Sequence, residues 1–181
     1  MDTRASRGAT PWIGTALRLV TGGVWLVAGG AKLGDLDGSV RAVRAYELLP
    51  EAVVPVVGSA LPVLEVAVGL MLVLGVLVRA NALLSAVLFA AFVVGIASAW
   101  GRGLEIDCGC FGGGGVEEGA SSKYPWEIAR DLALLAMSIW LVARPRTRLA
   151  LDTLLFRSHE WNTDADTERN DDGEEHPHLT R

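Results

Sequence analysis

The chain has 181 residues, and with 51% hydrophobic and 20% charged residues it is too apolar for an ordinary soluble domain. Its formal net charge of −5 at pH 7 argues against a general nucleic-acid-binding surface, because such surfaces are basic. The chain has two cysteines, Cys108 and Cys110, and this number excludes a disulfide-rich small protein and a zinc site made of four thiolates.

Four apolar segments are predicted to cross a membrane as α-helices. Residues 80–100 give the strongest signal, because these 21 residues include no Asp, Glu, Lys or Arg. At about 1.5 Å per residue, a helix of this length spans roughly 31 Å, which is the thickness of the hydrocarbon core of a bilayer. The other three segments are residues 12–33, 53–78 and 126–143. We therefore predict an all-α integral membrane protein in which residues 12–146 form a four-helix bundle.

The first and the fourth of these segments are less clear as membrane spans than the other two. Residues 12–33 follow Arg4 and Arg7, as the apolar part of a cleaved signal peptide would, but the segment is longer than such a part and lacks a clear cleavage site. Residues 126–143 carry three charges in their first turns, on Glu127, Arg130 and Asp131. The start of this fourth span is therefore the least defined of the four.

The distribution of Lys and Arg predicts the orientation of the protein in the membrane. If residues 1–11 lie in the cytoplasm, the cytoplasmic side carries eight of these residues and the outer side carries five. The positive-inside rule favours this arrangement, in which both termini are cytoplasmic. The loops at 34–52 and 101–125 then lie outside, and the second loop contains both cysteines. We predict a multi-pass protein of a bacterial cytoplasmic membrane, in contact with the lipid bilayer.

The composition changes after the last predicted span. Residues 158–181 are rich in Asp and Glu and poor in apolar side chains, which is typical of a disordered acidic tail. All three histidines lie in this tail, where a solvated, unstructured chain outweighs a metal site at His176 and His178. Residues 147–157 form either a short interfacial helix or a continuation of the fourth span.

Two cysteines separated by one glycine are the main candidates for chemistry. Gly109 permits the tight turn that a bond between Cys108 and Cys110 would need, and a strained, exposed disulfide exchanges readily with other thiols. The predicted outer location favours this redox interpretation, because disulfides persist outside the cytoplasm. The glycine run at 112–115 predicts a flexible segment beside the pair. A structural disulfide is an alternative, as is a metal site, for which no histidine is expected on this side of the membrane.

The acid beside the cysteines affects which of them reacts first. Asp107 directly precedes Cys108, and a neighbouring negative charge raises the pKa of a thiol. The thiolate is the attacking form, so this charge slightly favours Cys110 as the attacking cysteine.

Charged residues near the spans are candidates for supporting roles: Glu65, Lys32, Asp35, Arg130 and Asp131. Glu65 lies near the middle of its span, where an ionisable side chain is costly, so that it either handles protons or locks helices together. It is expected to be protonated or paired with Lys32 or Arg18. Lys32 and Asp35 either cap the first span and bind headgroups or face the cysteine loop. Arg130 and Asp131 either tune the thiol pKa or form an ordinary surface pair.

Several sequence blocks occur in a recognisable order: Ala31–Asp35, Tyr46–Pro50, Leu61–Glu65 with Gly69, and Cys108–Gly112. In these blocks the chain resembles the methylamine utilisation protein MauE family, within the wider DoxX-like membrane proteins. The resemblance covers roughly residues 12–143. It implies a four-helix membrane protein that assists the maturation of a disulfide-rich periplasmic subunit of methylamine dehydrogenase, often beside a thioredoxin-like partner.

The fold also looks like that of vitamin K epoxide reductase-type disulfide generators, which implies quinone as a cofactor. Those enzymes use a Cys-x-x-Cys motif and a second cysteine pair, whereas this chain has a single Cys-x-Cys motif. We therefore expect a thiol–disulfide redox partner that acts through Cys108 and Cys110 on an extracytoplasmic thioredoxin-like or client protein. The alternative is a non-catalytic assembly or transport subunit in which the two cysteines form a structural bridge.

Overall fold

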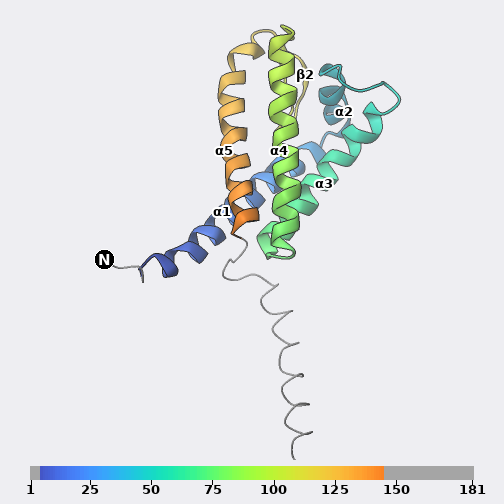
Figure 1. Ribbon diagram of the computed structural model, residues 1–181. Coiled ribbons are helices and arrows are strands. Elements are labelled where there is room, and N and C mark those ends of the chain that lie inside the picture. The colour runs from blue at the N-terminus through green and yellow to red at the C-terminus, as the bar shows by residue number, and fades with distance from the viewer. Residues whose placement is uncertain (1–4, 145–181) are drawn as a thin grey trace, which may run out of the picture.

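The computed structural model describes residues 5–144, and most of this part of the chain is α-helical (Figure 1). The predictions for residues 147–157 and for the tail at 158–181 lie outside the described residues. In chain order the helices are α1 Ala5–Leu33, α2 Leu36–Ala45, α3 Val54–Leu74, α4 Val78–Gly101 and α5 Tyr124–Ala143. This architecture confirms the predicted all-α class.

Three helices have the length and hydropathy of membrane spans, at Trp12–Leu33 in α1, Val54–Leu74 and Val78–Gly101. Their outer faces expose apolar side chains such as Val27 and Val63, as contact with lipid requires. The chain is therefore an integral membrane protein with several apolar helices. Helix α5 occupies the fourth predicted span, but it is not among the three described helices that meet these criteria. The passage of α5 through the membrane, and with it the four-helix bundle, stays a prediction.

The second predicted span ends earlier than expected. Helix α3 ends at Leu74 rather than at residue 78, because Gly75 adopts a left-handed conformation with φ of 73°. The amide of Gly75 donates to the carbonyl oxygen of Met71 at 2.9 Å, which closes the helix. Helix α4 already begins at Val78, so the predicted start of the third span at residue 80 is late.

Helices α1 and α3 approach each other closely at two glycines. A Cβ atom placed on Gly22 would lie 3.0 Å from the carbonyl oxygen of Gly69. A Cβ atom on Gly29 would lie 2.8 Å from the carbonyl oxygen of Pro62. Small residues at such positions let helix backbones come together in lipid, where no hydrophobic force drives the helices together. These contacts hold α1 and α3 side by side. They therefore fix the position of the last turn of α1, which carries Lys32, relative to α3.

A polar contact inside the bundle joins α1, α4 and α5. The indole of Trp25 donates to the hydroxyl oxygen of Ser85 at 2.6 Å, and Ser85 contacts the hydroxyl of Ser138 at 3.1 Å. The ring of Trp25 also stacks on Phe89, with 4.4 Å between the ring centroids. These contacts hold α4 and α5 beside the middle part of α1.

Helix α2 is absent from the sequence predictions, which treated residues 34–52 as a loop. Its first residue follows Asp35, whose carboxylate accepts from the amide of Gly38 at 2.8 Å and caps the helix. The hydroxyl of Ser39 donates to the carbonyl oxygen of Gly58 at 2.7 Å and ties α2 to α3. Small buried residues along α2 leave room for the second loop to pack against it.

A short hairpin in the second loop is also absent from those predictions. Strand β1 (Ile106–Asp107) pairs with strand β2 (Gly115–Val116) in antiparallel fashion. The hydroxyl of Tyr124, at the start of α5, accepts from the amide of Ile106 at 3.0 Å and donates to the carbonyl oxygen of Leu104 at 2.8 Å. The hairpin is thus anchored to α5, and the two cysteines lie in the turn between its strands.

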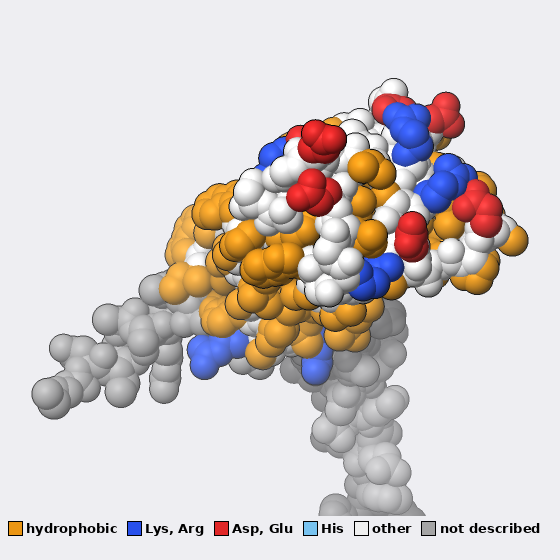
Figure 2. All heavy atoms as spheres, turned by 90° about the horizontal axis from the view of Figure 1, so that it is seen from above, with side chains coloured by type: hydrophobic (Ala, Val, Ile, Leu, Met, Phe, Trp, Pro, Cys, Tyr) orange, Lys and Arg blue, Asp and Glu red, His pale blue; other side chains and the backbone are white. Residues whose placement is uncertain are grey.

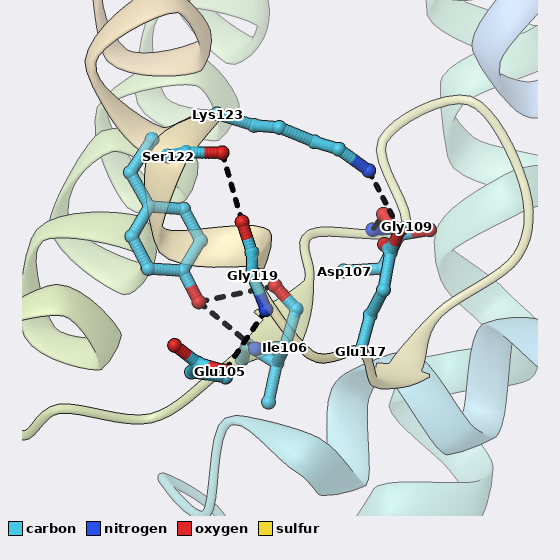
Figure 3. A network of polar contacts seen from close by, with 9 residues as sticks. Glu105, Ile106, Asp107, Gly109, Glu117, Gly119, Ser122 and Lys123 are labelled. Atoms are coloured by element: carbon cyan, nitrogen blue, oxygen red, sulfur yellow. Dashed lines mark hydrogen bonds and ion pairs between the residues drawn. The ribbon is translucent and has the colours of Figure 1, made fainter.

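Polar contacts around the hairpin reinforce this anchor (Figure 3). The carboxylate of Glu105 accepts from the amide of Gly119 at 2.9 Å, and the ammonium group of Lys123 lies 2.7 Å from the carboxylate of Glu117. Both contacts join the strands to the segment that leads into α5. They make the second loop a folded unit rather than an open linker.

The two long loops lie at the same end of the helices (Figure 1). Helix α2 contacts both β1 and β2 there. Seen from this end, acidic and basic side chains gather toward one part of the surface, and hydrophobic side chains cover much of the part beside it (Figure 2). The loops therefore share one side of the apolar helices, as the orientation prediction requires.

Candidate functional site

The two cysteines lie in a compact turn between β1 and β2. Cys108 is partly buried and Cys110 is 9% exposed, and both are free thiols. The amide of Cys110 donates to the sulfur of Cys108 at 3.4 Å. Gly109 between them has φ of 65°, and a Cβ atom there would lie 2.6 Å from the Cβ of Ala42 in α2. Glycine is therefore required both by the turn and by its close packing against α2.

The glycine run at 112–115 continues this packed turn. All four residues have positive φ values, which glycine adopts without strain. A Cβ atom on Gly114 would overlap Ala42, so this part of the run also lies directly against α2. The run gives the backbone the shape that brings the cysteines to α2.

The thiol of Cys108 is held in its protonated form. The side-chain hydrogen bond with Cys110 and the burial of the group raise the pKa of Cys108 above its ordinary value. The sequence also predicted a raised pKa, but attributed it to Asp107. The carboxylate of Asp107 instead accepts from the amide of Gly109 at 3.0 Å and stabilises the turn.

Tyr46, at the end of α2, contacts the same turn. Its hydroxyl donates to the carbonyl oxygen of Cys108 at 3.3 Å. Burial, and then the charge of Cys110, raise the pKa of the Tyr46 phenol, which keeps it neutral and able to donate. In the sequence, Tyr46 stands out only as the first residue of the block Tyr46–Pro50. An aromatic residue in a predicted loop gives no other sign of a contact with the cysteines.

A cavity of about 290 Å³ lies beside the cysteines, between α2, α3 and α4. Cys108 and Cys110 line one part of it, together with Tyr46, and the remaining walls are mainly apolar, for example at Leu61 and Phe92. The thiols therefore border a space that opens among the helices. Small-molecule sites are commonly apolar cavities of about this size or larger with a few polar groups in their walls.

Lys32 and Glu65 form a buried ion pair at the edge of this cavity. The ammonium nitrogen of Lys32 lies 2.6 Å from Oε1 of Glu65, and the two side chains are 5% and 0% exposed. The ammonium group also lies 5.4 Å from the centre of the Phe92 ring. Of the arrangements predicted for Glu65, the structure contains the pair with Lys32, which links α1 to α3.

Asp35 lies apart from this ion pair, at the start of α2. Its carboxylate caps α2 and pairs with the exposed guanidinium group of Arg41 at 3.3 Å. Asp35 therefore caps α2, a helix that the sequence did not predict, rather than the first span.

Arg130 and Asp131 lie on the other side of the cysteine turn. Arg130 Nε is 2.9 Å from Asp131 Oδ1, and Asp131 is 2% exposed. The guanidinium group of Arg130 lies 4.9 Å from the ring centre of Phe111, the residue after Cys110. Cys110 and both charged residues also line one small space. The pair therefore lies beside Cys110, with Asp131 buried and Arg130 partly exposed, rather than on an open surface.

Glu127 is a site residue that the sequence analysis missed. It lies one helical turn before Arg130, and its charge contributes to raising the pKa of the Cys108 thiol. The spacing of Glu127, Arg130 and Asp131 places all three on one face of a helix, which is the signal that could have identified it. The sequence suggested for Glu127 only that its charge makes the start of the fourth predicted span hard to define.

Comparisons with known proteins find a matching family and a relative of known name. The family described as methylamine utilisation protein MauE matches residues 10–144. The methylamine utilization protein MauE of Paracoccus denitrificans is 31% identical to the chain over 131 residues, which cover 71% of this chain and 68% of that protein. Among solved structures, no significant match was found.

Proposed function

Because the chain belongs to the methylamine utilisation protein MauE family, we propose that it is a membrane-embedded partner in thiol–disulfide exchange. The exchange takes place at Cys108 and Cys110. The observation that carries the proposal is the turn itself, in which two free thiols lie one residue apart and the amide of one cysteine contacts the sulfur of the other. Two thiols in such a position can act in sequence, one attacking and one resolving.

The reaction couples this dithiol to a disulfide in a second protein. One cysteine sulfur attacks a sulfur of that disulfide, whose S–S bond breaks, and a mixed disulfide forms. The other cysteine then attacks the mixed disulfide, which releases the second thiol of the partner and leaves Cys108 bonded to Cys110. Two electrons pass from this chain to the partner, and the reverse sequence oxidises a partner dithiol.

The family name suggests the class of partner. The relative in Paracoccus denitrificans is named for methylamine utilization. We infer that this chain acts in the maturation of an extracytoplasmic protein with disulfides, directly or through a thioredoxin-like protein. A methylamine dehydrogenase-type subunit is the client that the family resemblance favours.

The proposal includes a location for the site. We place the protein in the bacterial cytoplasmic membrane, with both termini in the cytoplasm and the cysteine loop outside. The common position of the two long loops at one end of the helices supports placing them on the same side of the membrane (Figure 1), and the distribution of Lys and Arg favours the outer side.

A labelling experiment tests this orientation. A Cys110→Ser variant, which retains Cys108, is expected to react with a membrane-impermeant maleimide in intact cells. The matched control is Ala80→Cys in a chain lacking both native cysteines, because this exposed position lies near the opposite ends of the helices. It should react only after permeabilisation. The reverse pattern of labelling would place the cysteine loop in the cytoplasm and contradict the proposed location.

The redox state of the pair tests the proposed chemistry. Membranes are quenched with acid, and free thiols are tagged with an alkylating reagent of known mass, with and without prior reduction. A fraction of the protein is expected to gain two tags only after reduction, because exchange oxidises both cysteines together. If both cysteines take the tag without reduction, even after treatment of the membranes with diamide, the pair does not form a disulfide and the proposed exchange is wrong.

A further inference from the structure

We propose that Asp131 takes up the proton that Cys110 loses when Cys110 resolves a mixed disulfide, and that one water molecule in the small cavity beside both residues carries this proton. The inference rests on the proposed thiol–disulfide exchange and assigns a proton acceptor to its second step. Because Asp131 acts through the water and does not touch the reacting sulfurs, it is a positioning residue.

A cavity of about 10 Å³ joins the cysteine turn to α5. Cys110 and Asp131 both line it, together with Arg130 and with apolar side chains of α1 and α4 such as Trp25 and Phe89. A cavity needs roughly this volume to hold one water molecule, and the water needs at least two polar partners. The thiol of Cys110, the carboxylate of Asp131 and the guanidinium group of Arg130 can supply them.

The carboxylate of Asp131 has hydrogen-bonding capacity left for this water. Its Oδ1 accepts from Nε of Arg130 at 2.9 Å. Its Oδ2 is buried and has no hydrogen-bond partner within residues 5–144. The side chain is 3% exposed, so bulk solvent does not satisfy this oxygen. A buried carboxylate oxygen without a partner is costly, and a water molecule between it and a thiol removes that cost.

Cys110 is the cysteine that needs an acceptor inside the protein. It is 9% exposed, whereas Cys108 is partly exposed, so a partner disulfide reaches Cys108 first. This order reverses the preference for Cys110 as the attacking cysteine that the sequence suggested. Cys110 then resolves the mixed disulfide from within. Its thiol must lose a proton as the new S–S bond forms, because the thiolate is the attacking form.

Arg130 fixes the orientation of Asp131 toward the cysteine turn. Its guanidinium group lies 4.9 Å from the ring centre of Phe111, the residue after Cys110, and the same group pairs with Oδ1 of Asp131. The pair therefore connects α5 to the turn and leaves Oδ2 for the cavity. A general base can act through one water molecule when its position is fixed in this way.

Charged and titratable groups from three elements surround Asp131. They are Arg130 and Glu127 of α5, Lys32 of α1, and Cys108 and Cys110 of the turn. Helix α4 lines the cavity with Phe89 and Phe92, neither of which titrates. The two cations attract the carboxylate of Asp131, and Glu127 repels it. The test must therefore separate proton uptake from a change in local charge.

The second step balances in atoms and electrons. After Cys108 has formed the mixed disulfide, the sulfur of Cys110 attacks the sulfur of Cys108. The bond between Cys108 and the partner breaks, and the partner sulfur leaves with the electron pair and takes a proton from solvent. The proton of Cys110 passes to the water, which gives a proton to Oδ2 of Asp131, and Asp131 later releases it to solvent. Over both steps the partner gains two electrons and two protons, and this chain gains one disulfide.

Resolution of an aromatic mixed disulfide tests the inference without any partner protein. The full chain in detergent is reduced, freed of reductant and mixed with one molar equivalent of dithiobis(nitrobenzoate). The absorbance of released thionitrobenzoate then reports first the attack of one cysteine and second the resolution by the other. Asp131→Asn is expected to slow the second release at neutral pH by about tenfold or more, since a general base contributes about 10²–10⁴-fold. At alkaline pH the rate should recover, because hydroxide then removes the proton.

Two control variants accompany this measurement. Glu118→Gln removes an exposed carboxylate of the cysteine loop and should leave both releases unchanged. Arg130→Gln combined with Asp131→Asn leaves neither charge of the pair without its partner, so it avoids the cost of a lone buried charge. It also lacks the acceptor, and its second release should be as slow as in Asp131→Asn. A wild-type rate in this double variant would assign the loss to the unpaired Arg130 and overturn the inference.

Two other results for Asp131→Asn also overturn it. An unchanged or faster second release would show that Asp131 only repels negative charge, because loss of that repulsion makes a thiolate easier to form. A loss of the same size at every pH would show disturbed packing, since hydroxide cannot compensate for a displaced turn.

The outcome is separable from that of the proposed function. If Asp131→Asn slows the second release but Cys110→Ser forms no mixed disulfide in cells, proton uptake stands and the exchange with a partner is wrong. If Cys110→Ser forms a mixed disulfide while the second release keeps its rate in Asp131→Asn, the exchange stands and the role of Asp131 is wrong.

Discussion

Lys32→Met is expected to lower the free energy of unfolding by about 3–5 kcal/mol, the usual effect of leaving one charge of a buried ion pair without its partner. The Lys32 ammonium lies 2.6 Å from the carboxylate of Glu65, and both side chains are almost fully buried between α1 and α3. Unfolding in detergent, followed by circular dichroism, measures the change. Glu65→Gln is expected to be destabilised as well, because it leaves the Lys32 ammonium buried without its partner.

A double variant and a control variant test whether the loss of stability comes from the buried ion pair. In the double variant Lys32→Met with Glu65→Gln, the loss should be smaller than the sum of the two single losses, because no buried charge is left without its partner. Arg44→Met removes one member of the exposed pair with Glu51 and should leave stability almost unchanged, because water screens that pair. Equal stability of Lys32→Met and Arg44→Met would show that the buried pair does not lock α1 to α3.

The apolar helices could be predicted because lipid imposes a simple rule on sequence. A helix that crosses a bilayer avoids charges over its full length, and residues 80–100 follow this rule without exception. The ends of helices were harder to predict. Gly75 ends α3 within a continuous apolar run, and nothing in the hydropathy of that run distinguishes a helix from a turn.

The folded loops could not be predicted, because their structure depends on contacts between distant segments. Helix α2 is only ten residues long and has Gly38 and Ser39 near its start, so the helical spacing of Leu36, Val40 and Val43 alone is a weak sign of a stable helix. The glycines at 112–115 resemble a flexible linker in sequence, yet their positive φ values and the contact of Gly114 with Ala42 shape a packed turn.

The candidate site could be predicted in part. Cys108 and Cys110 stand out by type and spacing, and Glu65 by its depth in an apolar segment. Pairing Glu65 with Lys32, rather than with another cation of α1, requires knowledge of how α1 and α3 cross. Glu127 was missed because a charge near the start of a span is ordinary, and only the fold brings that charge close enough to affect the pKa of Cys108.

The wild-type chain is expected to carry no lasting covalent bond to another protein, whereas Cys110→Ser is expected to form a stable mixed disulfide with its partner protein. Cys108 attacks a partner disulfide, and without Cys110 no second sulfur resolves the bond. Cys108→Ser should give little or no adduct, because it removes the more accessible of the two thiols. A structural bridge would behave differently, because its loss lowers stability and forms no new covalent species.

Non-reducing electrophoresis of membranes from cells with the wild type or either single variant tests the central claim most directly. Thiols are blocked before lysis, so that every adduct formed in the cell is kept. Exchange at the cysteine pair predicts a larger species in Cys110→Ser that disappears on reduction and is weak or absent in the other two samples. If both variants accumulate and support the function of the wild type without any such species, the cysteines do not act in exchange. The protein would then be a non-catalytic assembly or transport subunit.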